Sequence, residues 1–215
     1  MGHVQRRKEG LKFIMARYTG PKDRLSRREN YDLFGKGAKL TRINIPPGVH
    51  GPKGTYRGRP SEYLKQLREK QKVKRLYGVL EKQFRGYIDK AEKTKGNTAE
   101  KLFQLLETRL DNVVFRLGFA NSRPMARQLV THRHVFVDGK RVNIPSYQVR
   151  KGQTVSLSDK ALQMPDVKEL LKAKEANLPK WLQKKAAAGK ILRLPVRDDI
   201  PEPVDDQAVI EFYSR

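Results

Sequence analysis

Residues 109–130 read RLDNVVFRLGFANSRPMARQLV, and this stretch decides the fold of the middle of the chain. Leu110, Val113 and Leu117 recur at helical spacing and predict the buried face of a helix. After a short loop, Ser122 is placed to cap a second helix, because its hydroxyl can accept a hydrogen bond from an amide of the first turn. The stretch therefore predicts a helix–turn–helix arrangement.

The residues that follow predict a small antiparallel sheet. Residues 134–144, HVFVDGKRVNI, contain two β-prone runs joined by the Asp-Gly pair at 138–139, which is a strong hairpin signal. Residues 148–157, QVRKGQTVSL, predict another strand pair around the Lys-Gly pair at 151–152. Residues 108–160 are therefore expected to form two helices followed by a sheet.

Three helical segments are expected before this region. Ser61 can cap a helix that ends near Gly78, and a second helix follows it directly. Asn97 begins a third helix, where Glu100 has the spacing of a capping box. A break near residues 107–108 would divide this last helix into two.

The residues after the sheet show weaker patterns. Residues 167–176, VKELLKAKEA, predict a helix, and a looser tail begins at Pro179 and contains the single tryptophan, Trp181. Residues 190–196, KILRLPV, are a candidate strand. The Asp-Asp pair at 205–206 is placed to cap a last short helix.

The charge of the chain indicates its type of partner. It carries 47 Lys and Arg against 23 Asp and Glu, a formal net charge of +24 over 215 residues. Residues 1–60 hold 15 basic and 4 acidic side chains, whereas residues 166–215 hold 10 and 9. So large a cationic excess indicates a polyanionic partner, while the nearly neutral tail is expected to face protein.

Residues 1–60 are expected to be a basic N-terminal arm. Gly and Pro interrupt this segment repeatedly, as at 20–21, 46–48 and 51–52, and they disfavour regular helix or strand. The segment has little apolar material for a core of its own. We therefore expect it to become ordered on a phosphate surface.

Composition excludes several classes of protein. The chain has no cysteine, which excludes disulfides, thiolate zinc sites and a cysteine nucleophile. No apolar run approaches the roughly 20 residues of a membrane span, and residues 1–20 lack the apolar centre of a secretory signal. A soluble intracellular protein is expected.

We find no catalytic constellation in the sequence. Nucleotide-binding loops and the motifs of serine hydrolases and zinc proteases do not occur. His132 and His134 share one face of a strand without a third ligand nearby, so a structural or RNA-contacting role is favoured over a metal. The adjacent acidic residues at 198–199 and 205–206 diverge from each other and do not suit a shared acid–base site. We expect no enzyme, no cofactor and no metal.

Six stretches form a collinear set over nearly all of residues 15–215. They are MARYTGP at 15–21, LSRREN at 25–30, PPGVHG at 46–51, YLKQLREKQKVKRLYGVLEKQFRGY at 63–87, RLDNVVFRLGFANSRPMARQLV at 109–130 and VIEFYSR at 209–215. Together they resemble the family of the bacterial small-subunit ribosomal protein S4. Residues 109–142 also resemble the S4 RNA-binding domain, which occurs in other RNA-binding proteins and RNA-modifying enzymes.

The resemblance implies an α+β fold in which one domain is inserted into another. Residues 61–107 and 177–215 would form a mainly helical domain. Residues 108–176 would form the inserted S4 RNA-binding domain, with a helix-turn-helix-like pair and a small antiparallel sheet. Residues 1–60 would be the extended basic arm.

The resemblance also implies a structural constituent of the small ribosomal subunit. Such a protein binds 16S rRNA at a multi-helix junction of the 5′ domain and nucleates assembly of the body of the subunit. It contacts ribosomal protein S5, influences translational accuracy together with S5 and S12, and lies near the channel through which mRNA enters. A free RNA-binding chaperone or heat-shock-type factor with the same RNA-binding domain is the alternative.

One departure from the family concerns zinc. Members that carry a zinc site use cysteines in the N-terminal arm, and this chain has Asp23 and Ser26 where the first two are expected. Without thiolates we expect no zinc, and RNA would have to order the arm instead.

Binding of folded RNA requires phosphate neutralisation and recognition of shape, so Lys and Arg make up most of the predicted site. The residues expected to bind rRNA are Arg17, Tyr18, Arg27, Arg28, Arg57 and Arg59 in the arm, Arg68, Lys70, Lys72, Lys74, Arg75 and Arg85 in the helical domain, and Arg116, Ser122, Arg123, Arg127 and Gln128 on one outward ridge of the inserted domain. The residues expected to form polar rim contacts between the tail and S5 are Arg193, Arg197, Asp198, Asp199 and Glu202.

Overall fold

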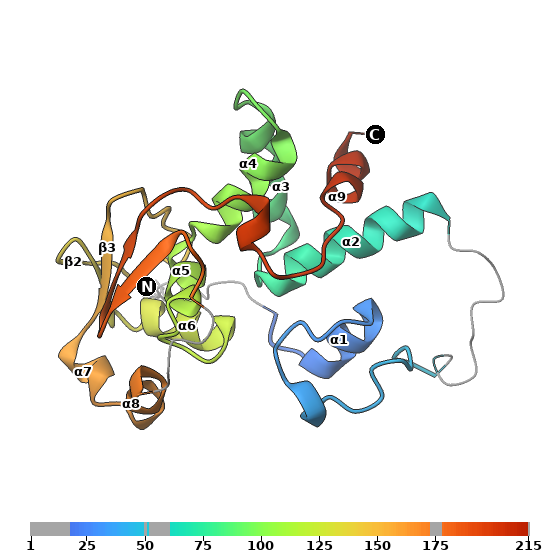
Figure 1. The fold of residues 1–215 in the computed structure, drawn as a ribbon. Coiled ribbons are helices and arrows are strands. Elements are labelled where there is room, and N and C mark those ends of the chain that lie inside the picture. The colour runs from blue at the N-terminus through green and yellow to red at the C-terminus, as the bar shows by residue number, and fades with distance from the viewer. Residues whose placement is uncertain (1–17, 50, 52–60, 173–177, 215) are drawn as a thin grey trace, which may run out of the picture.

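The computed structural model describes residues 18–49, 51, 61–172 and 178–214 (Figure 1). Its helices are α1 (Lys22–Glu29), α2 (Glu62–Leu76), α3 (Glu81–Glu92), α4 (Thr98–Glu107), α5 (Leu110–Arg116), α6 (Arg123–Thr131), α7 (Asp159–Leu162), α8 (Pro165–Lys172) and α9 (Asp206–Tyr213), with 3-10 turns η1 (Gly37–Lys39) and η2 (Arg197–Asp199). Its strands are β1 (Val135–Val137), β2 (Lys140–Arg141), β3 (Thr154–Leu157), β4 (Leu182–Lys185) and β5 (Ala188–Ile191). This mixture confirms the α+β fold class. Within these residues, no helix is both long enough and apolar enough to cross a membrane.

Helices α2, α3, α4 and α9 build one hydrophobic core, which we call the helical core. Val73 of α2, Phe84 of α3 and Leu106 of α4 are fully buried in it. Val209 of α9 joins them from the other end of the chain, and α9 lies beside α2 (Figure 1). The tail is therefore part of the helical core.

The predicted starts of α2 and α4 are confirmed. Ser61 Oγ accepts a hydrogen bond from the amide of Leu64 at 3.3 Å. Asn97 Oδ1 accepts one from the amide of Ala99 at 2.9 Å. Residues 108–109 separate α4 from α5, so the break considered for the third helix is real.

The strands form one antiparallel sheet in the order β2-β1-β3-β5-β4, and its core contains α5 and α6. We call this second group the sheet core. The predicted hairpin is confirmed, since Asp138 and Gly139 join β1 to β2 with φ angles of 48° and 77°. Positive φ at both positions is the requirement of the tight turn that Asp-Gly favours.

The prediction of a second strand pair around residues 151–152 is wrong. Only β3 forms in that region, and its neighbours are β1 and β5. Gln148 makes an isolated bridge to Arg109 instead. The candidate strand at 190–196 is displaced, because β5 ends at Ile191.

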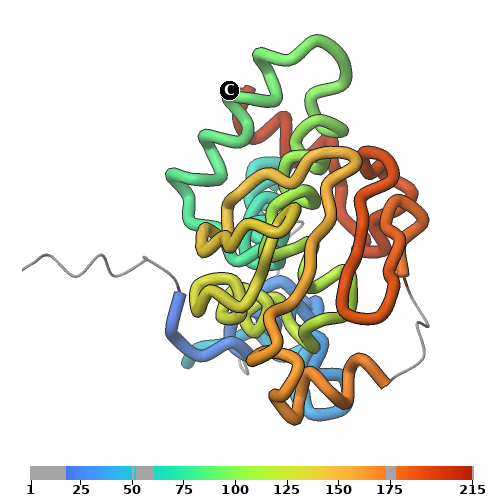
Figure 2. The backbone as a smooth tube through the Cα atoms, turned by 90° about the vertical axis from the view of Figure 1, so that its left-hand side faces the viewer, coloured from blue at the N-terminus to red at the C-terminus, as the bar shows by residue number. Residues whose placement is uncertain are grey.

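The expectation of a loose tail after residue 178 is also wrong. Trp181 is fully buried, and Leu182 and Ile191 lie beside it in the sheet core. Strands β4 and β5 extend the sheet from β3, whereas Ile200 already belongs to the helical core. Figure 2 shows the red C-terminal end beside the green helices, away from the orange strands of the same tail. Residues 182–191 therefore do not belong to the helical part as expected.

Residues 18–49 are not an arm without a core. Leu33 is buried in the helical core. Helix α1 is held against α2, because Glu29 Oε1 accepts from Arg68 Nη1 at 3.4 Å and also from Arg75. A few apolar side chains suffice here because the longer helices supply the rest of the core.

Gly189 lies close to Leu117 in the sheet core. A Cβ built on Gly189 lies 2.3 Å from Cδ2 and 3.0 Å from Cγ of Leu117, which is itself buried. Gly189→Ala is therefore expected to lower the free energy of unfolding by about 1–3 kcal/mol, measured by urea denaturation.

Gly86→Ala is the matched control for this prediction. Gly86 lies inside α3, and a Cβ built there meets nothing within 4 Å. Its replacement is expected to raise the free energy of unfolding by about 0.5–1 kcal/mol, because alanine loses less backbone entropy in a helix. Equal effects of the two substitutions would contradict the close approach at Gly189.

Candidate nucleic-acid interface

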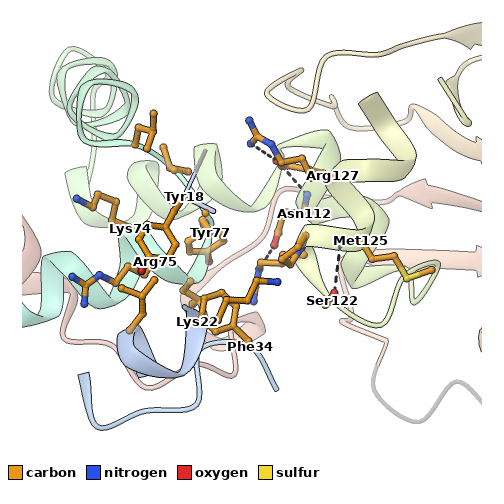
Figure 3. Close-up of a pocket in the computed structure, with 18 of the residues that line it drawn as sticks. Tyr18, Lys22, Phe34, Lys74, Arg75, Tyr77, Asn112, Ser122, Met125 and Arg127 are labelled. Carbon is orange, nitrogen blue, oxygen red and sulfur yellow. Dashed lines mark hydrogen bonds and ion pairs between the residues drawn. The ribbon is translucent and has the colours of Figure 1, made fainter. Parts of the chain in front are cut away.

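A cleft of about 740 Å³ lies where the helical core and the sheet core meet. Its lining comes from the segment that includes α1, from the end of α2 with residues 77–80, and from the start of α6. Figure 3 shows Tyr18 and Arg75 on one side and Ser122 and Met125 on the other. We call this space the junction cleft.

Residues predicted on separate surfaces come together in the junction cleft. The predicted RNA-binding residues that line it are Tyr18, Lys74, Arg75, Ser122, Arg123, Arg127 and Gln128. They come from the N-terminal segment, the helical core and the sheet core. The two cores therefore present one cationic surface between them.

Carboxylates fix the cations of one wall. Lys74 Nζ lies 2.7 Å from Glu81 Oε2, and the guanidinium of Arg75 binds Glu29. Burial raises the pKa of Glu81, but hydrogen bonds from Lys70 and Lys74 outweigh it and hold the pKa at about 2. The cations of this wall are thus held in place before any ligand arrives, which favours recognition of a fixed phosphate spacing.

The other wall is the start of α6. Ser122 Oγ accepts from the amide of Met125 at 3.4 Å, which confirms the predicted cap. Arg127 Nη1 lies 3.5 Å from Asp111 Oδ2, and Gln128 is exposed. The amide end of α6 therefore opens on the cleft, where the helix dipole favours an anion.

Behind the cleft lies a set of side chains that we call the buried network: Glu107, Asn112, Arg116, Arg123 and Glu202. Arg116 Nη2 donates to Glu107 Oε1 and to Glu202 Oε2, both at 2.7 Å. Arg123 donates to Glu202 Oε1 at 2.8 Å and to Asn112 Oδ1 at 2.9 Å. Asn112 Nδ2 donates to Glu107 Oε2 at 2.8 Å, so the network closes on itself.

The buried network joins both cores to the tail. Glu107 ends α4, Arg123 lies in α6, and Glu202 lies in the tail before α9. Tyr77, which follows α2, donates its hydroxyl to Glu107 Oε1 at 2.6 Å. The centroid of its ring lies 5.0 Å from the guanidinium carbon of Arg123. Removal of one member would leave the opposite charge buried without its partner, which is costly.

The network perturbs the pKa values of its members. Burial raises the pKa of Glu202, but the charges of Arg116 and Arg123 outweigh it and hold the pKa at about 2, below the ordinary 4.5. Burial and the neighbouring Glu107 carboxylate raise the pKa of the Tyr77 hydroxyl well above its ordinary value. Glu202 is therefore ionised, and Tyr77 neutral, across the physiological range.

Three predicted RNA-binding residues point inward instead. Arg116 and Arg123, expected on an outward ridge, have side chains only 7% and 12% exposed and belong to the buried network. The side chain of Lys70 is 6% exposed, and its Nζ lies 2.8 Å from Glu81 Oε1 and 4.4 Å from the ring centroid of Phe212. The outward orientation expected of these three side chains is wrong, because carboxylates and rings of other elements pair with the three cations.

The remaining predicted RNA-binding residues differ in exposure. Exposed ones are Tyr18, Arg28, Arg85 and Gln128, whereas Arg68, Lys72, Lys74, Arg75 and Arg127 are partly exposed and lie beside carboxylates. Arg27 donates to the carbonyls of Ile45 and Pro46 and so braces its own segment. Arg17, Arg57 and Arg59 lie outside the described residues.

The tail residues predicted to contact a protein partner also divide. Glu202 is buried, so its assignment to an exposed rim is wrong. Arg197 is half-buried and donates to three backbone carbonyls of the tail. Arg193 binds both carboxylate oxygens of Asp199, at 2.7 and 2.8 Å, and Asp198 is exposed. The surface of the tail therefore offers Arg193 and Asp198.

Sequence reasoning missed Lys22 and Asn112. Lys22 lines the cleft, and its Nζ lies 5.6 Å from the ring centroid of Phe34. The available signal for Asn112 was a polar stripe, since Arg109, Asn112 and Arg116 recur at spacings of three and four beside the apolar face of the helix.

Asp23, Ser26 and His134, which were considered as metal-binding positions, interact with other residues of the chain. Asp23 pairs with Lys36, and the carbonyl of Ser26 accepts from the amide of Tyr31 at 3.2 Å. His134 Nδ1 lies 3.3 Å from Ser158 Oγ. No group of three or more His, Asp and Glu in the described part of the chain is arranged to hold a metal ion.

Comparison with known proteins gives a consistent result. The family model for the ribosomal protein S4/S9 N-terminal domain matches residues 17–107, and the model for the S4 domain matches residues 108–155. The small ribosomal subunit protein uS4 of Geotalea daltonii is 50% identical over 211 residues, which cover 94% of this chain and 100% of the relative. The proteins of the same name from Geobacter sulfurreducens and Desulfitobacterium hafniense are 50% and 51% identical at the same coverage.

The buried network predicts a large effect of a small change at Glu202. Glu202→Gln keeps the shape of the side chain but removes the charge that Arg116 and Arg123 share. We expect the free energy of unfolding at pH 7 to fall by about 3 kcal/mol, measured by urea denaturation. Asp198→Asn is the control, since this exposed carboxylate is expected to contribute less than about 0.5 kcal/mol.

The same pair of variants tests the pH dependence. Because the folded pKa of Glu202 is about 2 and the ordinary value is 4.5, its stabilisation is complete above pH 4.5 and is lost as the pH falls toward 2. The difference corresponds to about 3 kcal/mol. Glu202→Gln should show a shallower loss of stability in this range than Asp198→Asn; parallel curves would contradict the assigned role.

Proposed function

The chain belongs to the ribosomal protein S4 family, and on this premise we propose that it is a structural component of the small ribosomal subunit that binds 16S rRNA. Like the other members of this family, it is a structural protein and not an enzyme. The observation that carries the proposal is the junction cleft, where cations from both cores converge. Neither core alone would present this surface.

The geometry of the cleft suits recognition of RNA shape. Its cations are held by carboxylates, so their spacing is fixed before binding. The major groove of an A-form helix is too deep and narrow for side chains to read, so a protein recognises such a helix mostly by its shape and by contacts to phosphates and 2′-hydroxyls. A surface shared by two cores can contact helices that diverge from one another.

We place the binding site at a multi-helix junction of the 5′ domain of 16S rRNA, where binding would nucleate assembly of the subunit body. Diverging helices present phosphates on more than one side, which matches a cationic surface assembled from two cores. A free RNA-binding chaperone, the alternative, would need residues 108–160 but not the helical core that forms one wall of the cleft.

We also propose that the tail contacts ribosomal protein S5. The tail is nearly neutral, and its surface offers Arg193 and Asp198 as polar contacts. The further roles, an influence on translational accuracy together with S5 and S12 and a position near the incoming mRNA, rest on the resemblance to the family.

Footprinting on naked 16S rRNA, combined with co-sedimentation, tests the main proposal. Protection of one multi-helix junction by the full chain is the expected result. Diffuse protection along the RNA would support the chaperone and contradict the ribosomal proposal.

Salt dependence tests which cations meet phosphate. Affinity for the 16S rRNA fragment should fall about 10³-fold or more between roughly 50 and 200 mM salt if six or more phosphates are engaged. Arg28→Ala removes an exposed cation and should reduce the slope of log affinity against log salt by about 1. Lys70→Met, the control, removes a buried and paired cation, so it should lower stability but leave the slope unchanged.

Charge reversal tests the contact with S5. Asp198→Lys changes an exposed residue, so the thermal stability of the chain should not change, while its affinity for S5 should fall about two- to fivefold. Lys95→Glu is the control, because it reverses the charge of an exposed residue in the loop between α3 and α4. Equal affinities of the two variants would contradict a contact through this part of the tail.

A further inference from the structure

Part of the lining of the junction cleft is apolar, and we call this part the apolar floor. Leu76 and Val79 line it from the helical core, and Phe34 and Met125 line it from two other segments. Phosphate groups gain nothing from such a surface, because transfer of a charge onto apolar groups is unfavourable. The cleft is therefore built for a ligand that has an apolar part as well as a charge.

Tyr18 provides an accessible aromatic face at the cleft. The residue is 49% exposed, and its hydroxyl donates to the carbonyl of Pro21 at 3.3 Å. The ring is folded over Gly20, since a Cβ built on Gly20 would lie 2.6 Å from the Tyr18 hydroxyl oxygen. The hydrogen bond and the contact with Gly20 orient the ring, and about half of the residue remains exposed.

The other aromatic groups of the cleft are already engaged. Tyr77 is buried, and its ring is covered by the guanidinium of Arg123. The ring of Phe34 has the ammonium of Lys22 5.6 Å from its centroid. Of the aromatic residues that line the cleft in the described part of the chain, Tyr18 is therefore the platform on which a flat group can stack.

The size of the cleft favours an unpaired nucleotide over an RNA duplex. Its volume of about 740 Å³ lies within the range of small-ligand sites, about 300–1,000 Å³, and is too small to enclose a duplex. Unpaired bases in junctions and loops can turn away from the helix and stack on aromatic side chains. Lys22, Lys74 and Arg75 lie around the same space and suit the phosphates on either side of such a base.

We propose that the junction cleft receives one unpaired nucleotide of the bound RNA. Its base stacks on Tyr18 above the apolar floor, and its flanking phosphates meet Lys22, Lys74 and Arg75. This proposal rests on the proposed rRNA binding and names the part of the RNA that the cleft takes.

The test compares two RNA probes on the full chain. One is a single-stranded RNA hexamer that carries one 4-thiouridine, and the other is an RNA duplex with the same number of phosphates. Tyr18→Leu should weaken binding of the hexamer about tenfold and leave binding of the duplex unchanged, because leucine cannot stack. Tyr18→Phe should bind the hexamer within about twofold of the unaltered chain.

Two further variants make the comparison specific. Gly20→Ala keeps every side chain of the cleft but displaces the Tyr18 ring. It should therefore weaken binding of the hexamer, as Tyr18→Leu does. Tyr63→Leu is the matched control, because Tyr63 is 52% exposed and does not line the cleft. It should leave both affinities unchanged.

The outcomes separate this proposal from the proposed function. Crosslinking of the thiouridine to residues 18–34 or 122–128, lost in Tyr18→Leu, supports the proposal. Equal hexamer affinities of Tyr18→Leu and Tyr63→Leu overturn it in favour of a different occupant of the cleft, such as a protein segment. If the 16S rRNA fragment still binds in that case, the proposed function stands; if the unaltered chain binds neither RNA, both fail.

Discussion

The buried network of two arginines, two glutamates and one asparagine is the interaction on which the arrangement of the molecule depends. It connects the end of α4, helices α5 and α6, and the tail through hydrogen bonds of 2.7–2.9 Å. Charges removed from water are tolerated only when each finds partners, and in this arrangement every charged member of the network has a partner of opposite charge. That arrangement fixes how the helical core meets the sheet core.

The junction cleft is a consequence of this constraint. Its two walls belong to different cores, and Arg123 contributes both to the network and to the lining of the cleft. A cationic total of +24 attracts any polyanion, but it does not distinguish one RNA from another. Discrimination requires cations at fixed separations, and the network and its neighbouring carboxylates supply that.

The sequence predicted those features that depend on neighbours along the chain. The caps at Ser61, Asn97 and Ser122 and the Asp-Gly hairpin follow from residues a few positions apart, and the structure confirms them. The buried position of Trp181 and the inward direction of Lys70 depend on partners in other helices and strands, so the periodicity of one segment could not predict them. A lysine on a basic helix looks the same in the sequence whether it faces phosphate or the carboxylate of Glu81.

The buried network is expected to hold the two cores in one relative orientation before RNA binds. Residual dipolar couplings of backbone amides in the free protein measure this directly. We expect a single alignment tensor to fit the amides of α2, α3 and α4 together with those of α5, α6 and the sheet. Two tensors of different magnitude or direction would show that the cores reorient independently, which would contradict a fixed orientation.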